Sequence, residues 1–560
     1  MLKTKFISSL DKCFLDQNYD DFAEIKNVNI YRNTDASFQL LPYNEEDVRY
    51  VCTTYIVKVE GDLAKHVELK TVENVPNYIP FFGTPKVASE RDPNYLRVTP
   101  GLYPDVLMPI SIVNRFNVVN QTLRTIWIDV KNDGSFTPGE HTLKITLNTE
   151  DGRIAAENEI TINVIDAFLP EQETRVTQWF YADCLADYYD VKVWSKKHFD
   201  ICRRFIKMAA DNGINMILTP IFTPPIDTAI GGERTTTQLI KVTVTDGKYE
   251  FDFSLFDKWI DMLKECGIKY FEMSHLFTQW GAEHAPKIVA TVNGRKKKIF
   301  GWETDASSKE YVDFLNQFLK EFTAHLDKLE LRDYVYFHIS DEPSEKHIEQ
   351  YKLNKKNVEK VLKGWKLLDA MSHVEFYQQG LCEIPVAVSS HIEDFLKEDI
   401  NERWVYYCWE PDQGYSNRYL GIHSARTRFM GIQMYKYGMD GFLQWGYNFY
   451  NNRFSYDAIN PFLNPNAGYW SLGGDAVTVY PGHKGNPISS IRLISFRQGL
   501  EDIRALKLCE QYYSKEEIIN KIEKVFGENI VFSKCADDTA TMQKIRDTID
   551  KMIIDKIKQC

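Results

Sequence analysis

The spacing of apolar residues along the chain changes near residue 170. Upstream, residues 22–168 are rich in short stretches with the period of two that is typical of β-strands. In residues 139–164, apolar residues alternate with polar ones on both sides of a Glu150-Asp151-Gly152 turn, which predicts a β-hairpin. The alternating apolar residues are Leu143, Ile145, Leu147, Ile160, Ile162 and Val164. Many short strands favour an N-terminal β-sandwich domain over residues 1–170, ending in a Leu169-Pro170 linker.

From Val176 onward, strand-like and helix-like patterns alternate. We expect strands at 176–183, 215–221, 269–276, 334–342, 373–378, 384–390, 403–409 and 441–448. Amphipathic stretches predict helices at 195–212, 254–266, 307–328, 346–368 and 424–437. Eight such units favour the α/β class and a (β/α)8 barrel over residues 171–560, with closing helices from residue 500. A doubly wound open sheet is the alternative architecture.

Composition and charge exclude several classes of protein. The chain has 67 Lys and Arg against 79 Asp and Glu, a net charge of −12, which argues against a dedicated nucleic-acid binder. No apolar run approaches the roughly 20 residues of a membrane span, and charges interrupt residues 1–15. The ten cysteines are scattered without metal-ligand spacing, which fits a reducing compartment. We therefore expect a soluble, cytoplasmic protein without membrane insertion.

The aromatic content of 13% is high, and much of it falls in predicted loops. In a barrel, chemistry collects at the carboxyl ends of the strands, where the loops form the site. Long loops follow strand two, with a hairpin at Asp246-Gly247, and strand three, with a hairpin at Asn293-Gly294. The loop after strand eight carries Phe449, Tyr450, Phe454, Tyr456, Phe462, Tyr469, Trp470 and Tyr480. Aromatic rings in a cleft suit the alternating C–H and O–H surfaces of sugars.

The end of predicted strand four carries two adjacent carboxylates, Asp341 and Glu342, before Pro343. Alternation along the strand places His338, Ser340 and Glu342 on one polar face. Glu342 is therefore expected to point into the cleft, and Asp341 joins it only if the strand bends. A glycosidase needs one carboxyl to protonate the leaving oxygen and a second anionic group for the developing positive charge. The alternative role is structural, in capping the next helix or pairing with a lysine.

Other candidate chemistry is weaker. Glu410, after strand seven, is a possible nucleophile, because many retaining glycosidases carry acids on strands four and seven. Those enzymes usually have Asn before the strand-four acid, where this chain has Asp341. The motifs GxGxxG, GxxxxGK[ST], HExxH and GxSxG are absent from the sequence. His275 and His391 are expected at the barrel mouth as hydrogen-bonding residues, and we expect neither a metal nor an organic cofactor.

The segment Ser340-Asp341-Glu342-Pro343 resembles the catalytic segment of glycoside hydrolase family 123, the β-N-acetylgalactosaminidases. The segments 480–482, 490–492 and 497–502 resemble the closing segment of that family. The resemblance covers most of residues 22–510. It implies a β-sandwich before a (β/α)8 barrel, and a substrate-assisted reaction in which the 2-acetamido oxygen of the substrate attacks the anomeric carbon. By this resemblance, Asp341 polarises the acetamide and Glu342 is the general acid/base.

The resemblance therefore implies a retaining exo-glycosidase that removes terminal β-linked N-acetylgalactosamine from oligosaccharides or glycosphingolipids, without a cofactor. No motif identifies the sugar-binding residues. From their expected positions at the barrel mouth we name His275, Tyr407, Trp445, Tyr447, Asn448 and Trp470. One alternative is a barrel glycosidase of other specificity that uses Glu342 and Glu410. Another is a non-catalytic carbohydrate-binding or scaffold protein.

Overall fold

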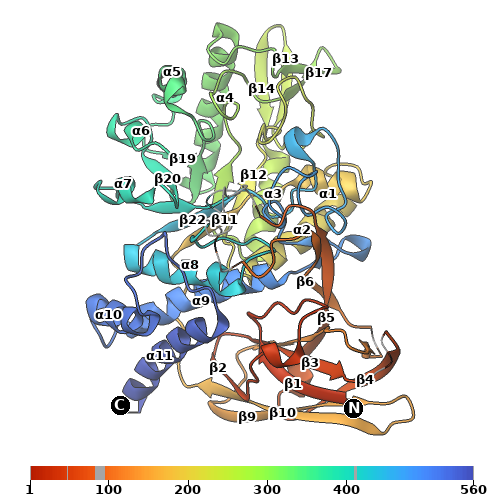
Figure 1. Ribbon diagram of the computed structural model, residues 1–560. Coiled ribbons are helices and arrows are strands. Elements are labelled where there is room, and N and C mark those ends of the chain that lie inside the picture. The colour runs from red at the N-terminus through yellow and green to blue at the C-terminus, as the bar shows by residue number, and fades with distance from the viewer. Residues whose placement is uncertain are drawn as a thin grey trace.

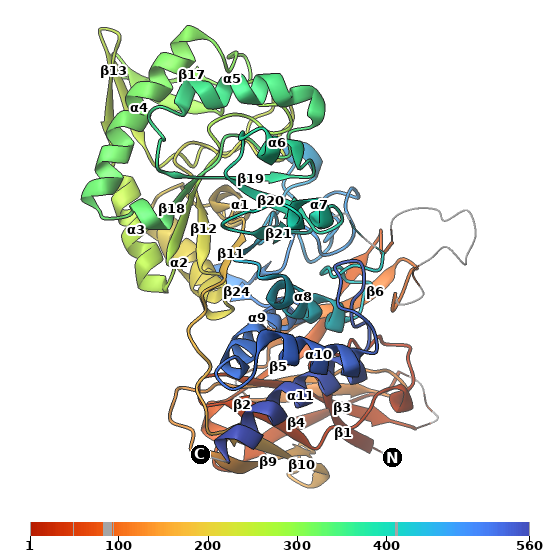
Figure 2. The ribbon, with the colours of Figure 1, turned by 90° about the vertical axis from the view of Figure 1, so that its left-hand side faces the viewer.

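The computed structural model describes residues 2–46, 48, 50–81, 92, 95–111, 113–408, 411 and 413–558. Its N-terminal strands form the lower part of the molecule in Figures 1 and 2, and a barrel forms the upper part. The last of the C-terminal helices, drawn in blue, lie beside the N-terminal strands, to their left in Figure 1 and in front of them in Figure 2. The chain therefore returns to its own beginning after it has completed the barrel.

The N-terminal region consists of two five-stranded sheets. The first has the order β1 (Leu2–Ser8), β3 (Ala36–Asn44), β8 (Ile126–Val130), β5 (Val67–Asn77) and β6 (Gly101–Pro109). The second has the order β2 (Asn27–Tyr31), β10 (Ile154–Ile165), β9 (Gly139–Asn148), β4 (Cys52–Glu60) and β7 (Arg115–Val119). The predicted hairpin is confirmed as the antiparallel pair β9–β10. Side chains of both sheets, such as Phe38 and Leu143, join one apolar cluster.

Eight parallel strands close into a barrel in chain order, because the last strand pairs with the first. They are β11 (Arg175–Gln178), β12 (Met216–Thr219), β15 (Tyr270–Met273), β18 (Val335–Phe337), β19 (Lys366–Met371), β20 (Ile384–Val388), β21 (Trp404–Tyr406) and β22 (Gly441–Gln444). The barrel prediction is confirmed, and the alternative of an open, doubly wound sheet is wrong.

Helices follow each barrel strand, although some are short. They are α1 (Ala182–Tyr188), α2 (Lys196–Asp211), α3 (Ser254–Cys266), α4 (Lys309–Lys328), α5 (Ile348–Val358), α6 (Glu375–Gln378), α7 (Ile392–Leu396) and α8 (Ser424–Tyr437). The closing helices are α9 (Ile491–Cys509), α10 (Lys515–Phe526) and α11 (Thr539–Ile557). Within the described ranges, no helix is both long and apolar enough to cross a membrane.

Two hairpins inserted in the barrel loops form a sheet of their own. The strands β13 (Lys241–Thr245) and β14 (Lys248–Asp252) follow β12, and β16 (Ile288–Val292) and β17 (Arg295–Phe300) follow β15. The parallel pairing of β13 with β16 joins both predicted hairpins into one four-stranded sheet. A further short pair, β23 (Tyr480–Pro481) and β24 (Pro487–Ile488), precedes α9.

The predicted position of the fifth barrel strand, 373–378, is wrong. The strand is β19, and residues 375–378 form α6 instead. The helical pattern of residues 346–368 extends into β19, but α5 ends at Val358. Gly364 then adopts a left-handed φ of +79°, which interrupts any further helix. The buried run that follows is mostly apolar, and periodicity cannot separate a buried strand from a buried helix.

A buried ion pair joins the N-terminal sheet to the closing helices. The guanidinium of Arg492, on α9, donates to the carboxylate of Asp105, on β6, at 2.9 and 2.8 Å. Both side chains are completely buried, and the Tyr480 hydroxyl donates to the same carboxylate at 2.6 Å. Removing one partner of such a pair leaves an uncompensated charge. The pair therefore fixes α9 and the segment before it against β6.

The helices α8 and α9 cross at two glycines. A Cβ on Gly431 would lie 2.1 Å from the carbonyl oxygen of Gly499, and one on Gly499 would lie 2.6 Å from the Arg428 carbonyl oxygen. Only glycine allows the two backbones to approach this closely. The crossing therefore depends on the absence of side chains at Gly431 and Gly499.

We expect Gly431→Ala to destabilise the protein by about 1–3 kcal/mol, the range for overpacking in a tight core. The obstacle is backbone, which cannot move aside as a flexible side chain would. Urea unfolding followed by circular dichroism measures the change. Gly101→Ala is the matched control, because a Cβ there meets nothing within 4 Å. Equal stability of the two variants would contradict the packing at this crossing.

Candidate active site

A cavity of about 280 Å³ lies at the carboxyl ends of the barrel strands. Its lining combines three carboxylates with five aromatic side chains, contributed from several sides of the barrel. The carboxylates are Asp227, Asp341 and Glu342, and the aromatic residues are Trp179, Trp280, Tyr406, Trp445 and Trp470. This is the end of a barrel at which loops build active sites. We refer to it as the mouth pocket.

Asp341 and Glu342 both line the mouth pocket. The strand β18 ends at Phe337, earlier than predicted, and Glu342 has a left-handed φ of +43°. This is the bend that Asp341 requires to join Glu342 in the cleft. Two backbone hydrogen bonds hold it: Glu342 N–H donates to the Ala370 carbonyl at 3.1 Å, and Trp280 N–H donates to the Asp341 carbonyl at 2.9 Å.

The carboxyl of Asp341 is strongly perturbed by its surroundings. Asp341 is only 7% exposed, and burial raises the pKa of its carboxyl well above the usual range. The charge of the adjacent Glu342 raises the pKa further, and Asp369 and Glu272 add smaller effects in the same direction. The imidazole of His338 opposes them. Two carboxyl groups so close together resist ionising at once, which is the condition for retaining a proton near neutral pH.

A buried network of charges lies inside the barrel below these carboxyls. His338 bonds through Nε2 to Glu272 at 2.6 Å and through Nδ1 to Asp369 at 3.1 Å, and all three residues are completely buried. Burial alone would lower the pKa of His338, but the bonds to Asp369 and Glu272 raise it to about 9. Trp179 Nε1 donates to Glu272 at 2.7 Å, and the Tyr351 hydroxyl donates to Asp369. His338 therefore carries a positive charge in the centre of the barrel.

The hydroxyl of Tyr406 donates to Glu342 Oε1 at 2.6 Å. Tyr406 ends β21 and lines the mouth pocket, so it fixes the Glu342 carboxyl from the far side of the barrel. The residue predicted from the sequence at this position is the next one, Tyr407, which does not line the pocket. Neighbouring residues of a strand point to opposite sides, and the choice between them depends on a register that the sequence does not give.

Two of the predicted sugar-binding residues, Trp445 and Trp470, line the mouth pocket. Their ring centroids are 6.0 Å apart in an edge-to-face arrangement. Trp445 Nε1 donates to Asp475 at 3.0 Å, and the guanidinium of Arg453 lies 5.3 Å from the centre of a Trp470 ring. The two rings are therefore held in place before any ligand is bound.

Tyr447 and Asn448 lie outside the lining of the mouth pocket. Both are completely buried, and both have partners inside the protein. The Tyr447 hydroxyl donates to the Phe205 carbonyl at 2.8 Å, and the Asn448 amide exchanges two hydrogen bonds with the backbone of Tyr181. These hydrogen bonds hold the loop after β22 in place, so the two side chains have a structural role.

Tyr407 and His275 also lie outside this lining, and both are completely buried. The Tyr407 ring packs edge-on against Phe442. His275 stacks on His338 at 4.2 Å, and its pKa is held well below the usual range by burial and by the charge of His338. We place neither of them, nor Tyr447 or Asn448, among the sugar contacts proposed below.

The mouth pocket also contains Asp227, Gln279 and Trp280, which no sequence pattern identifies. They belong to the segments after β12 and β15. The length of these loops is a signal of function, but it does not single out any residue within them. Glu410, the alternative nucleophile, lies outside the described residues.

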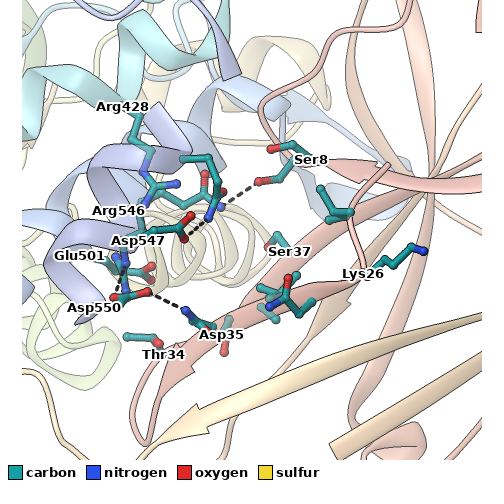
Figure 3. Close-up of a pocket in the computed structure, with 18 of the residues that line it drawn as sticks. Ser8, Lys26, Thr34, Asp35, Ser37, Arg428, Glu501, Arg546, Asp547 and Asp550 are labelled. Carbon is teal, nitrogen blue, oxygen red and sulfur yellow. Dashed lines mark hydrogen bonds and ion pairs between the residues drawn. The ribbon is translucent and has the colours of Figure 1, made fainter. Parts of the chain in front are cut away.

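Two other places in the protein gather titratable groups. One is a cavity of about 620 Å³ between the N-terminal sheets and the closing helices (Figure 3). There Asp502 of α9 accepts from Arg428 of α8 at 2.6 Å and from Arg546 of α11 at 2.7 Å. Arg546 also bonds Asp550 at 2.8 Å. These ion pairs tie three helices together, so we assign them a structural role.

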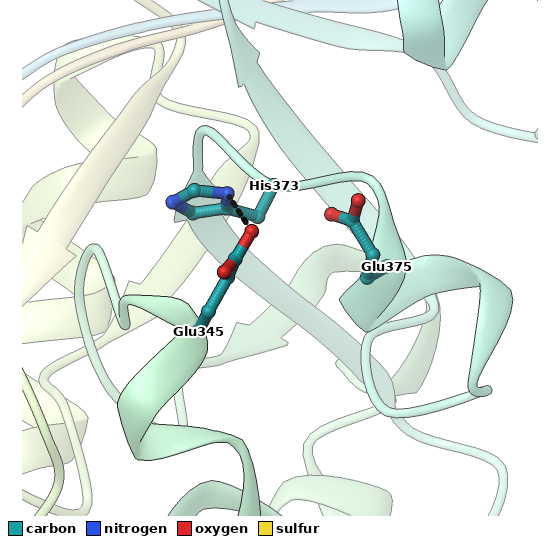
Figure 4. A group of neighbouring side chains, drawn as sticks. All are labelled: Glu345, His373 and Glu375. Carbon is teal, nitrogen blue, oxygen red and sulfur yellow. Dashed lines mark ion pairs between the residues drawn. The ribbon is translucent and has the colours of Figure 1, made fainter.

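The other place is the group Glu345, His373 and Glu375, drawn in Figure 4. One ligand atom from each lies within 4.8 Å of the others, and His373 Nδ1 is 3.5 Å from Glu345 Oε1. Both glutamates are exposed, and the group does not line the mouth pocket. Exposed acidic groups at such distances are ordinary on protein surfaces, and we assign no metal here.

Comparison with known proteins gives one family and one whole-chain likeness. The model of the family "Glycoside hydrolase 123, catalytic domain" matches residues 179–509. A family 123 glycoside hydrolase from Clostridium perfringens, described for glycolipid glycan hydrolysis, is 17% identical with a TM-score of 0.72. The alignment covers 100% of this chain and 99% of that one, and it shows a shared fold. No protein with a curated description matches the chain.

Two other solved structures align only partly. A glycoside hydrolase family 5 protein from Bacteroides vulgatus is 13% identical, with a TM-score of 0.29 over 59% of this chain and 66% of that one. An endo-beta-1,4-mannanase from Thermotoga petrophila is 13% identical, with a TM-score of 0.33 over 60% and 78%.

We expect His338→Gln to destabilise the protein by about 3–5 kcal/mol, because Glu272 and Asp369 lose the cation between them. His391→Gln, at an exposed histidine, is the matched control.

The wild-type free energy of unfolding should also fall as pH rises from 6.5 towards about 9. The folded protein holds its proton on His338 across that range, whereas the unfolded chain has lost it. Urea unfolding at several pH values measures both effects, and an unchanged pH slope in His338→Gln would contradict this assignment.

Proposed function

Given that the chain belongs to glycoside hydrolase family 123, we propose that this glycosidase removes terminal β-linked N-acetylgalactosamine from glycans or glycolipids. It acts as a retaining exo-enzyme in which the 2-acetamido group of the substrate is the nucleophile. The observation that carries the proposal is the pair Asp341 and Glu342, adjacent in sequence and both lining the mouth pocket. A terminal sugar is the intended occupant, since a cavity of about 280 Å³ is small for a longer glycan.

In the first step, the acetamide oxygen attacks the anomeric carbon while the bond to the leaving oxygen breaks. Glu342 donates its proton to that oxygen as general acid. Asp341 accepts a hydrogen bond from the acetamide N–H and stabilises the positive charge of the cyclic oxazolinium. In the second step, Glu342 removes a proton from water, which opens the ring at the anomeric carbon with overall retention. No second carboxylate is needed as a protein nucleophile.

The surroundings of the two carboxyls support these roles. Burial and the charge of the adjacent Glu342 raise the pKa of Asp341, so the pair retains one proton more readily than an isolated acid would. In our proposal this proton resides on Glu342 once the substrate N–H is bonded to Asp341. The Tyr406 hydroxyl, 2.6 Å from Glu342, orients the acid. Trp445 and Trp470 supply flat apolar surface for the sugar.

Two broader expectations remain part of the proposal. We interpret the two N-terminal sheets as a β-sandwich domain over residues 1–170, on the support of the apolar cluster that they share. We also retain a cytoplasmic location, which follows from the sequence pattern alone.

We expect Glu342→Gln to reduce kcat/KM by a factor of about 100 or more on substrates with poor leaving groups, because the proton donor is lost. Aryl glycosides with good leaving groups should lose less, since their departure needs less protonation. Steady-state kinetics on both substrate types measures the difference. Glu345→Gln, an exposed glutamate three residues away, is the matched control. A uniform loss on both substrates together with an unfolded variant would instead favour a structural role for Glu342.

The acetamide mechanism predicts that activity depends on the substrate's 2-acetamido group. An aryl β-galactoside with a plain 2-hydroxyl should be essentially inert, although it keeps the other ring groups. A thiazoline mimic of the cyclised intermediate should bind more tightly than the substrate does. Glu410→Gln should leave the chemistry largely intact. Rapid cleavage of the 2-hydroxy substrate, or a glycosyl ester trapped on Glu410, would refute the mechanism in favour of a Glu342 and Glu410 glycosidase.

A further inference from the structure

We propose that Asp227 and Gln279 form a specificity pair that binds hydroxyl groups of the terminal sugar, on ring carbons remote from the anomeric carbon. The inference rests on the proposed function, because it assumes that a sugar occupies the mouth pocket. Both residues line that pocket, and neither takes part in the reaction described above. They lie on the segments after β12 and β15, whereas the reacting pair follows β18.

The first support is that both side chains hold buried polar atoms without a partner. Asp227 is 4% exposed, and neither of its carboxylate oxygens makes a well-formed hydrogen bond in the described part of the chain. The backbone of Phe454 lies close enough to lower the pKa of this carboxyl, but burial has the larger effect. Gln279 is 7% exposed, and the same holds for its Nε2. Buried polar groups are nearly always hydrogen-bonded, and an unpaired buried carboxylate is especially costly. Groups of this kind in a ligand-sized cavity are suited to partners that the ligand brings.

The second support is the complementarity of the two groups. Asp227 presents acceptors and Gln279 presents a donor, and a sugar hydroxyl both donates and accepts. The two residues are also bonded to each other through other atoms: Gln279 Oε1 accepts a hydrogen bond from the backbone N–H of Asp227 at 2.6 Å. This bond fixes the amide so that its Nε2 remains available. One hydroxyl can donate to Asp227 and accept from Gln279, and a neighbouring hydroxyl can use the second carboxylate oxygen.

The backbone of Asp227 is held in an unusual conformation. Its φ is +45°, in the left-handed region that side-chain-bearing residues seldom adopt. Besides the bond from its N–H to Gln279, its carbonyl accepts from the Ser455 hydroxyl at 2.7 Å. Strained backbone of this kind persists where the surroundings over-determine it, and it clusters at ligand sites. The carboxylate is thus oriented by the protein before a sugar arrives.

The nearby buried cation does not neutralise Asp227. Arg234 is bonded to Asp183 through Nε at 2.8 Å and to the Ile226 carbonyl at 3.0 Å. Arg453, which lines the pocket, is exposed and lies over the Phe454 and Trp470 rings. Burial accordingly raises the pKa of Asp227 to about 6. Above that pH the carboxylate is charged, and charged acceptors make the stronger hydrogen bonds to hydroxyls.

The test uses aryl β-N-acetylgalactosaminides that lack the hydroxyl at C3, C4 or C6. For wild-type enzyme, at least one deletion should lower kcat/KM by about tenfold or more, because it leaves buried polar groups unpaired. In Asp227→Ala, the parent substrate should lose a similar factor, and the penalty for deleting that same hydroxyl should vanish. Such non-additivity marks a direct contact, whereas a merely structural residue would lower all substrates alike. A full deoxygenation penalty in Asp227→Ala would overturn the inference and leave the proposed function standing.

Two further measurements keep the outcome decisive. Asp187→Asn is the matched control, because Asp187 bonds the Thr235 hydroxyl and does not line the pocket. Calorimetric titration with N-acetylgalactosamine and its deoxy analogues repeats the comparison without turnover, and Asp227→Asn replaces Asp227→Ala if the latter does not fold. Wild-type protein that turns over none of the substrates would overturn the proposed function, and the titration would then decide the role of Asp227. Equal affinity of wild type and variant for every analogue would overturn the inference.

Discussion

The charge of His338 is the interaction on which the centre of the barrel depends. Glu272 and Asp369 are completely buried carboxylates on β15 and β19, the two strands that flank β18, and His338 bonds to both. Without this cation, two negative charges would face each other in a medium that screens them poorly. Because His338 lies three residues before Asp341, the same network also fixes the segment that carries the proposed catalytic pair. One buried histidine therefore stabilises the barrel and positions the segment to which we assign the chemistry.

Three residues of the mouth pocket have a strained backbone. Asp227, Trp280 and Glu342 all line it, and all have a left-handed φ, of +45°, +60° and +43°. Each is held by backbone hydrogen bonds to a neighbouring segment, as in the bond from Trp280 N–H to the Asp341 carbonyl. The strain turns side chains inward that a regular strand or turn would direct elsewhere. Rigid barrel strands supply the support for it, which is the general arrangement of sites on loops over a fixed scaffold.

The N-terminal sheets contribute to the site indirectly. Arg492 bonds Asp105 of the first sheet and also donates to the carbonyls of Gly474 and Val477. The segment between those carbonyls contains Asp475, which accepts the hydrogen bond from Trp445. An apolar wall of the mouth pocket is thus anchored, through one guanidinium, to a strand far away in the sequence.

The sequence by itself determined the barrel, its hairpins and the proposed catalytic pair, because these depend on local periodicity and on adjacent residues. Asp341 and Glu342 are neighbours in the chain, so the sequence identifies both, whereas the bend that brings both into the pocket comes from the fold. Only the tertiary structure decided between Tyr406 and Tyr407, since a shift of one residue in register reverses which one faces the pocket. It also decided Asp227, whose oxygens become unpaired only when separate loops exclude water from around them. Burial and pairing arise from segments distant in sequence, and no local pattern records them.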